Sequence, residues 1–285
     1  MAIIVNTNLS ALMTQNNLNK ASNSLNTALE RMSTGYKINS AKDGAANMFV
    51  ATNLEKQING SKIAQSNVSM GINVLDIVEG DLDVILDNLN RIRDLTVQAS
   101  NGIYDDDSKE ALANEVSARM DEITRVVEAS NFNGLQLLNG SIANDLRLQV
   151  GADSDAAANS ISISKDIFAS KNAQELGLDP TNITTAFATP TAAANYLEVV
   201  DEAIKNVNTS KATIGSVQNR LQAASDSLTT TIENATAAKS TIMDADIAEV
   251  SAEFTRQQIL LQTSSALLLQ ANSLPSMALT LVSGI

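Results

Sequence analysis

Acidic side chains form the cluster in this sequence that comes nearest to a chemical site. Asp105, Asp106 and Asp107 are consecutive, and Glu110 follows about one helical turn later. Carboxylates of this kind bind calcium, but an EF-hand loop requires Gly at its sixth position and Glu at its twelfth. Glu110 and Val116 occupy those positions. The better interpretation is negative charge at the N-terminus of a helix, where it interacts favourably with the helix dipole.

The chain lacks two of the side chains that catalytic sites use most often. The chain contains neither Cys nor His, which excludes thiolate nucleophiles, imidazole bases, disulfides and the common zinc sites. No glycine-rich phosphate loop or nucleophile elbow accompanies the remaining Asp, Glu, Lys, Ser and Tyr residues. Asp153 and Asp155 are interpreted as solubilising loop residues. We therefore expect no enzyme activity, no cofactor and no metal.

The net charge of the chain limits the kinds of partner that it can bind. The 285 residues carry a formal charge of −13, which argues against nucleic acid and anionic membranes because both need a Lys/Arg surface. No stretch approaches the roughly 20 apolar residues of a membrane span. The N-terminal sequence MAIIVNTNLS lacks the basic and long apolar regions of a secretory signal. We expect any export to use a route other than general secretion.

The apolar residues suit long helices. Aromatic residues make up only 3% of the chain, whereas hydrophobic residues reach 44%, a balance typical of slender bundles with small side chains at their contacts. Because proline interrupts helices, its absence from residues 1–179 and 191–274 allows two long helical tracts. In the first tract, an apolar seam steps by three and four residues through Leu18, Ala21, Leu25, Ala28 and Met32. Gly35 is expected to cap this helix.

Two further helices are predicted in the N-terminal half. The first runs from about residue 44 to 100, with an apolar stripe at Val68, Ile72, Leu75, Leu82, Leu86 and Leu89 that Ile77, Val78, Val84, Ile85 and Ile92 widen. A wide stripe indicates packing against several neighbours. The second begins after a turn at residues 101–107 and carries Leu112, Val116, Ile123 and Val127.

The middle of the chain loses helical periodicity. Asn131–Gly134 is expected to end the third helix, and apolar residues alternating between 135 and 150 predict short strands or a hairpin around Asn139-Gly140. Residues from about 151 to 190 are rich in Ala, Asp, Ser, Asn and Thr. This segment is predicted to be a surface-exposed insert or loop.

The second tract has the most regular periodicity. Its apolar and small residues step by four and three from Tyr196 to Ile242, which predicts a helix of about 70 Å at about 1.5 Å per residue. After residues 244–246, another amphipathic helix runs through Ile247, Val250, Phe254, Leu261 and Leu268. Many seam positions at both ends are small or polar, so these helices are expected to order fully only when other copies cover them.

The expected fold is therefore mainly α: a long antiparallel helical coiled-coil bundle with a small β-hairpin region and paired chain termini. Residues 1–43 and 244–285 are expected to form an inner, assembling domain. Residues 44–190 and 191–243 are expected to form an outer helical domain. The predicted assembly residues are Leu18, Leu25, Met32, Ile247, Val250, Phe254, Leu261 and Leu268.

Motifs in both halves resemble a known family. In the N-terminal half they are IVNTN at 4–8, QNNLNK at 15–20, ERMSTG at 30–35, INSAKDGAA at 38–46, LTVQA at 95–99 and NFNG at 131–134. In the C-terminal half they are GSVQNRL at 215–221, DADIA at 244–248 and QANSLP at 270–275. With this order and spacing, the chain resembles bacterial flagellin over about residues 1–150 and 190–282, and the short middle makes it similar to a minimal flagellin.

The resemblance implies a structural subunit that polymerises with itself into the flagellar filament used for swimming. It implies export of the unfolded chain by the flagellar type III system, with an export chaperone, a filament cap protein and hook–filament junction proteins as further partners. The location it implies is secreted and extracellular, in the flagellar filament. Arg91, Leu95 and Glu115 match the positions by which the flagellin-sensing Toll-like receptor, an innate immune receptor of the host, recognises the family.

Two rival interpretations remain. A hook–filament junction protein shares the terminal motifs, but the LTVQA and NFNG motifs favour flagellin. A flagellin that bears a metalloprotease insert needs His-Glu-X-X-His, which a chain without His excludes.

Overall fold

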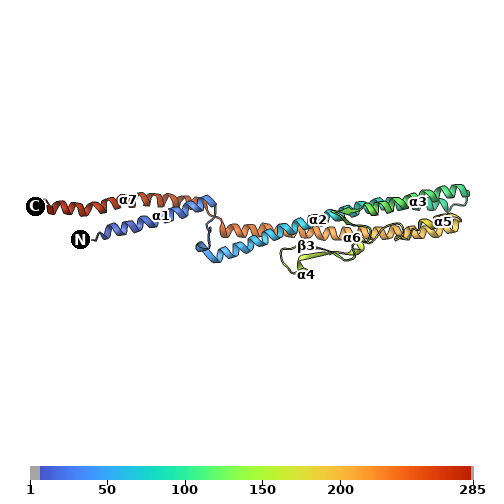
Figure 1. The fold of residues 1–285 in the computed structure, drawn as a ribbon, viewed down its shortest axis with the longest axis horizontal. Helices are drawn as coiled ribbons and strands as arrows, with labels where there is room; N and C mark the ends of the chain where they lie inside the picture. Colours follow the sequence, from blue (N-terminus) through green and yellow to red (C-terminus); the bar gives the residue numbers. More distant parts are fainter. Residues whose placement is uncertain (1–6, 284–285) are drawn as a thin grey trace. The chain divides into compact units, whose positions relative to one another are not determined.

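The computed structural model describes residues 7–283, with side chains described up to residue 273 except at position 156 (Figure 1). Residues 4–6 of the first motif, like the outermost residues of the two expected terminal segments, lie outside the described part. The elements are α1 (Leu9–Thr34), α2 (Ala41–Ala99), α3 (Asp106–Ala129), β1 (Asn131–Phe132), β2 (Leu135–Gln136), β3 (Leu146–Gln149), α4 (Ala156–Asn159), β4 (Ser160–Ile163), η1 (Lys165–Phe168), η2 (Pro180–Asn182), α5 (Ile183–Phe187), α6 (Pro190–Met243) and α7 (Ile247–Ser283). This mainly helical fold confirms the expected class.

The chain divides into two compact units. The terminal unit combines the residues up to Lys56 with those from Asn234 onward, and the central unit comprises Gln57–Glu233. Both α2 and α6 contribute residues to each unit. Each unit is described separately below.

In the terminal unit, α1 and α7 pair side by side (Figure 1). Near the start of α1, the Asn8 side-chain amide donates a hydrogen bond of 2.6 Å to the carbonyl oxygen of Ala271. Just after the other end of α1, the Ala245 backbone N–H donates to the Gly35 carbonyl at 2.8 Å. Because the two ends of α1 meet opposite ends of α7, the helices are antiparallel, and the predicted pairing of the termini is confirmed.

The end of α1 follows the sequence prediction. Gly35 has φ of 75°, the left-handed conformation that glycine adopts without steric cost, and its N–H donates to the Arg31 carbonyl. Beyond this cap, the Lys37 N–H donates to the Met243 carbonyl at 2.7 Å. Ile38 then packs with Ala51 and Met243 in a small apolar cluster. The α1–α2 connection is thereby joined to the end of α6.

In the central unit, α2 and α6 run antiparallel. Polar contacts between them pair rising positions of α2 with falling positions of α6: Gln65 with Thr229, Asp76 with Gln218 and Arg93 with Asp201. The predicted stripe of α6 is buried from Tyr196 to Leu221, as is most of the stripe of α2. Ile77 and Val84 are exceptions, because they are 39% and 43% exposed and do not widen the core as expected.

The short strands predicted between residues 135 and 150 are present as β2 and β3, but they do not pair with each other. β1 pairs with β2 across Asn133 and Gly134, whose φ values of 50° and 82° have the signs that a two-residue type I′ turn requires. β3 pairs with β4, which comes from the expected insert. The predicted turn at Asn139-Gly140 is therefore wrong as a hairpin, although Gly140 does adopt a positive φ of 79°.

Residues 151–190 are not the exposed insert that their composition predicted. Phe168 and Phe187 are almost fully buried, and the ring of Phe187 lies edge-on to Tyr196 with centroids 6.2 Å apart. The other apolar side chains that this segment buries in the core of the central unit are Ile161, Ile163, Ile167, Ala173, Leu176, Leu178 and Ile183. Short strands and 3₁₀ turns place these residues inward at irregular spacing, so no single period is visible in the sequence.

Gly71 permits close contact between α2 and β3. A Cβ atom built at Gly71 would overlap Cδ1 of Leu148, whereas Gly80 of the same helix has nothing within 4 Å. We expect Gly71→Val to force the Leu148 side chain away from α2 and to lower the free energy of unfolding by about 1–3 kcal/mol in urea titrations. Gly80→Ala, the control, should raise it by about 0.5–1 kcal/mol through helix propensity. Equal stabilities for the two variants would contradict this packing.

Candidate functional site

The candidate site is the surface of the α1–α7 pair in the terminal unit. Six of the predicted assembly residues lie along the seam between the helices: Val250 is buried, and Leu18, Leu25, Phe254, Leu261 and Leu268 are half-buried. The other two predicted residues, Met32 and Ile247, do not lie along this seam. Met32 is 38% exposed and Ile247 is 48% exposed, so both point away from the partner helix.

Most of the buried side chains described on this pair are small. Ala21 and Ala28 of α1 and Ser264 and Ala271 of α7 are each less than 10% exposed. Side chains of this size let two helices approach closely but bury little apolar area. The shared core of the pair is consequently thin.

Most of the large apolar side chains that the structure describes on this pair, up to residue 273, face solvent. On α1 these are Leu9, Leu12, Met13, Leu29 and Met32; on α7 they are Ile247, Ile259, Leu260, Leu267 and Leu269, and exposure ranges from 38% to 72%. Single exposed apolar residues are ordinary, but a set this dense on two adjoining helices marks an interaction surface. Apart from Met32 and Ile247, sequence reasoning missed these residues. The available signal was that each helix carries apolar residues on more than one face.

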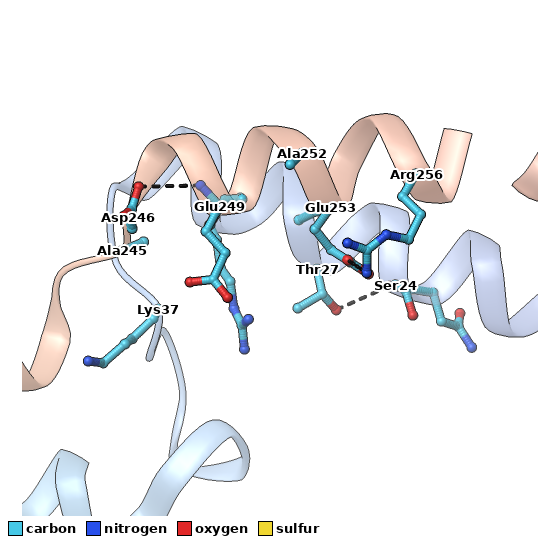
Figure 2. A pocket seen from close by; sticks show the side chains of 13 residues that line it. Ser24, Thr27, Lys37, Ala245, Asp246, Glu249, Ala252, Glu253 and Arg256 are labelled. Atoms are coloured by element: carbon cyan, nitrogen blue, oxygen red, sulfur yellow. Dashed lines mark hydrogen bonds and ion pairs between the residues drawn. The ribbon is translucent and has the colours of Figure 1, made fainter. Parts of the chain in front are cut away.

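A groove of about 620 Å³ lies beside the pair near the end of α1 (Figure 2). Its lining includes the small residues Ala28 and Ala252 and the charged residues Arg31, Lys37 and Glu249. Within the groove, Arg256 forms an ion pair of 2.8 Å with Glu253 on the adjacent turn of α7. A concave surface lined by small residues and by charges of both signs suits a protein segment better than a small substrate.

Local hydrogen bonds fix the beginnings of α7 and α2. The Asp246 carboxylate accepts hydrogen bonds from the backbone N–H groups of Ala248 and Glu249, which caps α7. The Asp43 carboxylate accepts from the hydroxyl and N–H of Ser40, and these bonds lower the pKa of Asp43. Both caps hold the chain at the points where it enters a helix.

No catalytic centre emerges among residues 7–283. The described residues contain no group of three or more acidic, Cys or His side chains placed to hold a metal ion. Asp105 instead caps α3, accepting from the Ser108 N–H at 3.0 Å, and Asp106 and Asp107 lie in the first turn. Hydrogen bonds from Ser108 lower the pKa of the Asp105 carboxyl. The interpretation of this acidic run as helix N-terminal charge is confirmed.

The three predicted receptor positions lie in the central unit. The Arg91 guanidinium of α2 forms an ion pair of 2.8 Å with Glu115 of α3, and both side chains are well exposed. Leu95 is only 1% exposed and belongs to the core beneath them. Arg119, which the sequence reasoning did not single out, approaches the same Glu115 carboxylate at 4.0 Å. The structure thus brings two of the three positions together at the surface.

None of the helices in the described part combines the length and apolar character that crossing a bilayer requires.

Comparison with known families gives two matches that together cover most of the chain. Residues 5–143 match the bacterial flagellin N-terminal helical region. Residues 197–282 match the bacterial flagellin C-terminal helical region.

Full-length relatives agree with these matches. The chain is 32% identical to the flagellar filament 30.7 kDa core protein of Treponema maltophilum, covering 99% of this chain and 100% of the relative. It is 31% identical to flagellin FlaB1 of Treponema pallidum, covering 95% and 96% respectively. It is 33% identical to the flagellar filament core protein flaB2 of Brachyspira hyodysenteriae, covering 98% and 100%.

A solved structure supports the fold. A Vibrio parahaemolyticus protein described as a flagellar hook-associated protein superposes with a TM-score of 0.59 at 18% identity, over 71% of this chain and all of that one. At this identity the likeness concerns the arrangement of the helices alone. The family matches and the full-length relatives go further, and by them this chain belongs to the bacterial flagellin family, a family of structural filament proteins and not of enzymes.

Proposed function

We propose that this chain is a subunit that polymerises with its own copies into the flagellar filament used for swimming. The observation that carries the proposal is the dense set of exposed apolar side chains on the α1–α7 pair. The full-length relatives that are named flagellar filament core proteins support it.

The physical basis is coupling between assembly and ordering of the ends. Burying one Leu or Ile side chain contributes about 1.5–3 kcal/mol, and the exposed set includes Leu12, Ile259 and Leu269. Several such side chains buried between copies offset the roughly 4–15 kcal/mol that association costs in lost freedom. Because neighbouring copies bind only the ordered pair, polymerisation also stabilises it.

Electron microscopy of the purified chain under polymerising conditions tests this function. We expect helical filaments of flagellar diameter. A solution that stays monodisperse at all concentrations would contradict the proposal.

We extend the proposal to the route and the location. The chain is expected to leave the cell unfolded through the flagellar type III system with an export chaperone, and to be added beneath a cap protein to a filament joined to the hook by junction proteins. Its final location is then extracellular. The lack of Cys and the thin core of the α1–α7 pair suit passage of an unfolded chain. Secretion that persists in cells without a working type III apparatus would overturn this part.

We also propose that the monomer activates the flagellin-sensing Toll-like receptor through the surface around Arg91 and Glu115, with Leu95 positioning both from the core. Arg91→Ala and Glu115→Ala should each reduce the response of a receptor reporter cell about tenfold, the effect of losing about 1.4 kcal/mol of binding. Their melting temperatures should change little, because an exposed ion pair contributes only about 0–1 kcal/mol.

Arg125→Ala provides the matched control for the receptor experiment. Arg125 forms an exposed ion pair of 2.6 Å with Glu122 on the same helix as Glu115. Its removal should leave the reporter response unchanged. Purified monomer that gives no response at all would rule out receptor activation, and equal losses for Arg91→Ala and Arg125→Ala would remove the assigned surface.

A further inference from the structure

Four Asn-Gly pairs give this chain four places where its backbone can react with one of its own side chains. In such a pair the backbone nitrogen of Gly attacks the side-chain carbonyl carbon of Asn, and glycine has no side chain to obstruct the approach. The fold decides which pair can react. The pairs are Asn59-Gly60, Asn101-Gly102, Asn133-Gly134 and Asn139-Gly140.

The attack requires a particular backbone conformation at Asn. The Gly nitrogen reaches the side-chain carbon only when this nitrogen and the Asn Cβ atom are eclipsed about the Cα–C bond. For an L-residue this means a ψ of about −120°, the value at the first central residue of a type II′ turn, where φ is about +60°. Residues with negative φ do not populate this value of ψ. An Asn that already has a positive φ therefore needs the smaller rearrangement.

Asn133 is placed to reach this conformation. Its φ is 50°, and it is the one non-glycine residue with a positive φ in the described part of the chain. It occupies the first central position of the β1–β2 turn, and Gly134 occupies the second. Rotation of the peptide group between them converts a type I′ turn into a type II′ turn. This rotation keeps φ of Asn133 near its present value and takes Gly134 to a negative φ, which glycine adopts readily.

The surroundings of this turn leave it free to rotate. Asn133 and Gly134 are both exposed, and a Cβ atom built at Gly134 would have no neighbour within 4 Å. Among the described residues, the Asn133 side chain has no hydrogen-bond partner and the Gly134 N–H donates to no carbonyl. The attacking nitrogen and the carbon that it attacks are therefore both available.

Two of the other pairs are held in their present conformation. Asn59 lies inside α2, and a Cβ atom built at Gly60 would come within 2.7 Å of the Ala152 side chain. The side chain of Asn101 accepts a hydrogen bond of 3.4 Å from the Ile103 N–H. Asn59 would have to leave its helix before it could react, and Asn101 would have to break this bond and change the sign of φ.

The pair nearest in sequence to Asn133 offers the closest comparison. The side chain of Asn139 accepts a hydrogen bond of 3.0 Å from the Ser141 N–H. A Cβ atom built at Gly140 would lie 3.4 Å from both Cβ and N of Ser170, so this glycine is packed where Gly134 is open. Asn139 also lacks a positive φ. It has the same dipeptide sequence as Asn133 but a less reactive environment.

We propose that Asn133 is a site of self-modification, where the chain loses ammonia and forms a cyclic imide that water then opens. In the first step the Gly134 nitrogen bonds to the side-chain carbon of Asn133. The bond from that carbon to its amide nitrogen breaks, and ammonia leaves with the proton of the Gly134 N–H. In the second step, water adds to either carbonyl of the ring and breaks the bond from that carbonyl to the ring nitrogen. The products are aspartate and isoaspartate at position 133.

The two products differ in their effect on the hairpin. Both replace a neutral amide by a carboxylate, which adds one negative charge. Isoaspartate also adds a CH₂ group to the main chain, and the β1–β2 ladder consists of only two residue pairs. We expect isoaspartate to open this hairpin and aspartate to preserve it, because Asp-Gly also suits a type I′ turn. The modification needs only water and accumulates with the age of a chain, so it does not depend on the proposed polymerisation.

Mass spectrometry of the aged full-length chain tests the site. The folded chain is incubated at mildly alkaline pH and digested with trypsin. The peptides 57–62, 94–109 and 126–147 then contain all four pairs, and fragment ions separate Asn133 from Asn139. Asn133 should convert about tenfold faster than each of the other three, the factor that corresponds to bringing an L-residue to a positive φ. A methyltransferase specific for isoaspartate should label the peptide 126–147.

Two controls separate the effect of the fold from the reactivity of the dipeptide. In guanidinium chloride the unfolded chain should convert all four pairs at similar rates. Asn133→Gly, which suits a positive φ, should abolish the modification at this position and leave the rates at Asn101 and Asn139 unchanged. Conversion of Asn101 or Asn139 as fast as Asn133 in the folded chain would overturn the proposal. It would also be overturned if the folded and unfolded chains gave the same relative rates, or if Asn133 reacted only after unfolding.

Discussion

A chain lacking residues 1–40 and 245–285 is expected to remain helical and monomeric and to form no filaments. The deletion removes both α1 and α7, and with them the exposed apolar side chains that the proposed assembly buries. The central unit keeps its own core, which includes Leu75, Leu89 and Val200. Circular dichroism should show strong helical content, sedimentation should give a monomer, and electron microscopy should show no polymer.

Deleting one end at a time separates the two terminal helices. Removal of residues 1–40 alone leaves the seam of α7 without its partner, so this chain should also fail to form filaments and should self-associate irregularly through its apolar surface. The chain without both ends should stay soluble, because it lacks that surface. Regular filaments from the doubly truncated chain would show that assembly does not depend on the termini.

Long periodic helices could be predicted from the sequence because packing repeats one rule over many turns. The stripe of α6 steps by four and three residues, and residues from Tyr196 to Leu221 are buried as that pattern requires. The end of α1 was equally predictable, since Gly35 supplies the left-handed cap. Each of these features depends on residues that are near one another in the sequence.

The middle of the chain could not be predicted in the same way. β3 finds its partner β4 across a segment of irregular composition, and the Leu146–Ile163 pairing has no local signal. Apolar residues such as Phe168 enter the core from a 3₁₀ turn, where helical and strand periods both fail. Polar composition alone therefore suggested an exposed loop where the structure has a core-forming segment.

The residues between α1 and α7 were predicted only in part, and their role in assembly stays a prediction. Leu18, Leu25 and Leu261, which were predicted as assembly residues, are half-buried on the α1–α7 pair. Met32 and Ile247 fit the same spacing in the sequence but point outward, because the buried positions near that end are Ala28 on α1 and Val250 on α7. A single helix period identifies an apolar stripe, whereas the direction in which the stripe faces depends on the partner helix.

Leu89→Ala is expected to lower the melting temperature of the central unit strongly, whereas Leu25→Ala should barely change it. Leu89 is fully buried in the core between the long helices, and a Leu-to-Ala change at such a site costs about 2–5 kcal/mol. For a unit of this size that corresponds to a fall of about 5–15 °C in a calorimetric scan. Leu25 is only half-buried and belongs to the terminal unit.

For polymerisation we expect the reverse: Leu25→Ala should have the large effect and Leu89→Ala the small one. In the proposed filament, other copies cover the α1–α7 pair and complete the burial of Leu25, so Leu25→Ala should raise the critical concentration about tenfold. Leu89→Ala should leave the critical concentration nearly unchanged at temperatures well below its melting point, because the central unit is then still folded. If Leu25→Ala instead lowered the main melting transition and left assembly intact, the α1–α7 pair would be part of the monomer's stable core and could not act as the part of the chain that orders on assembly.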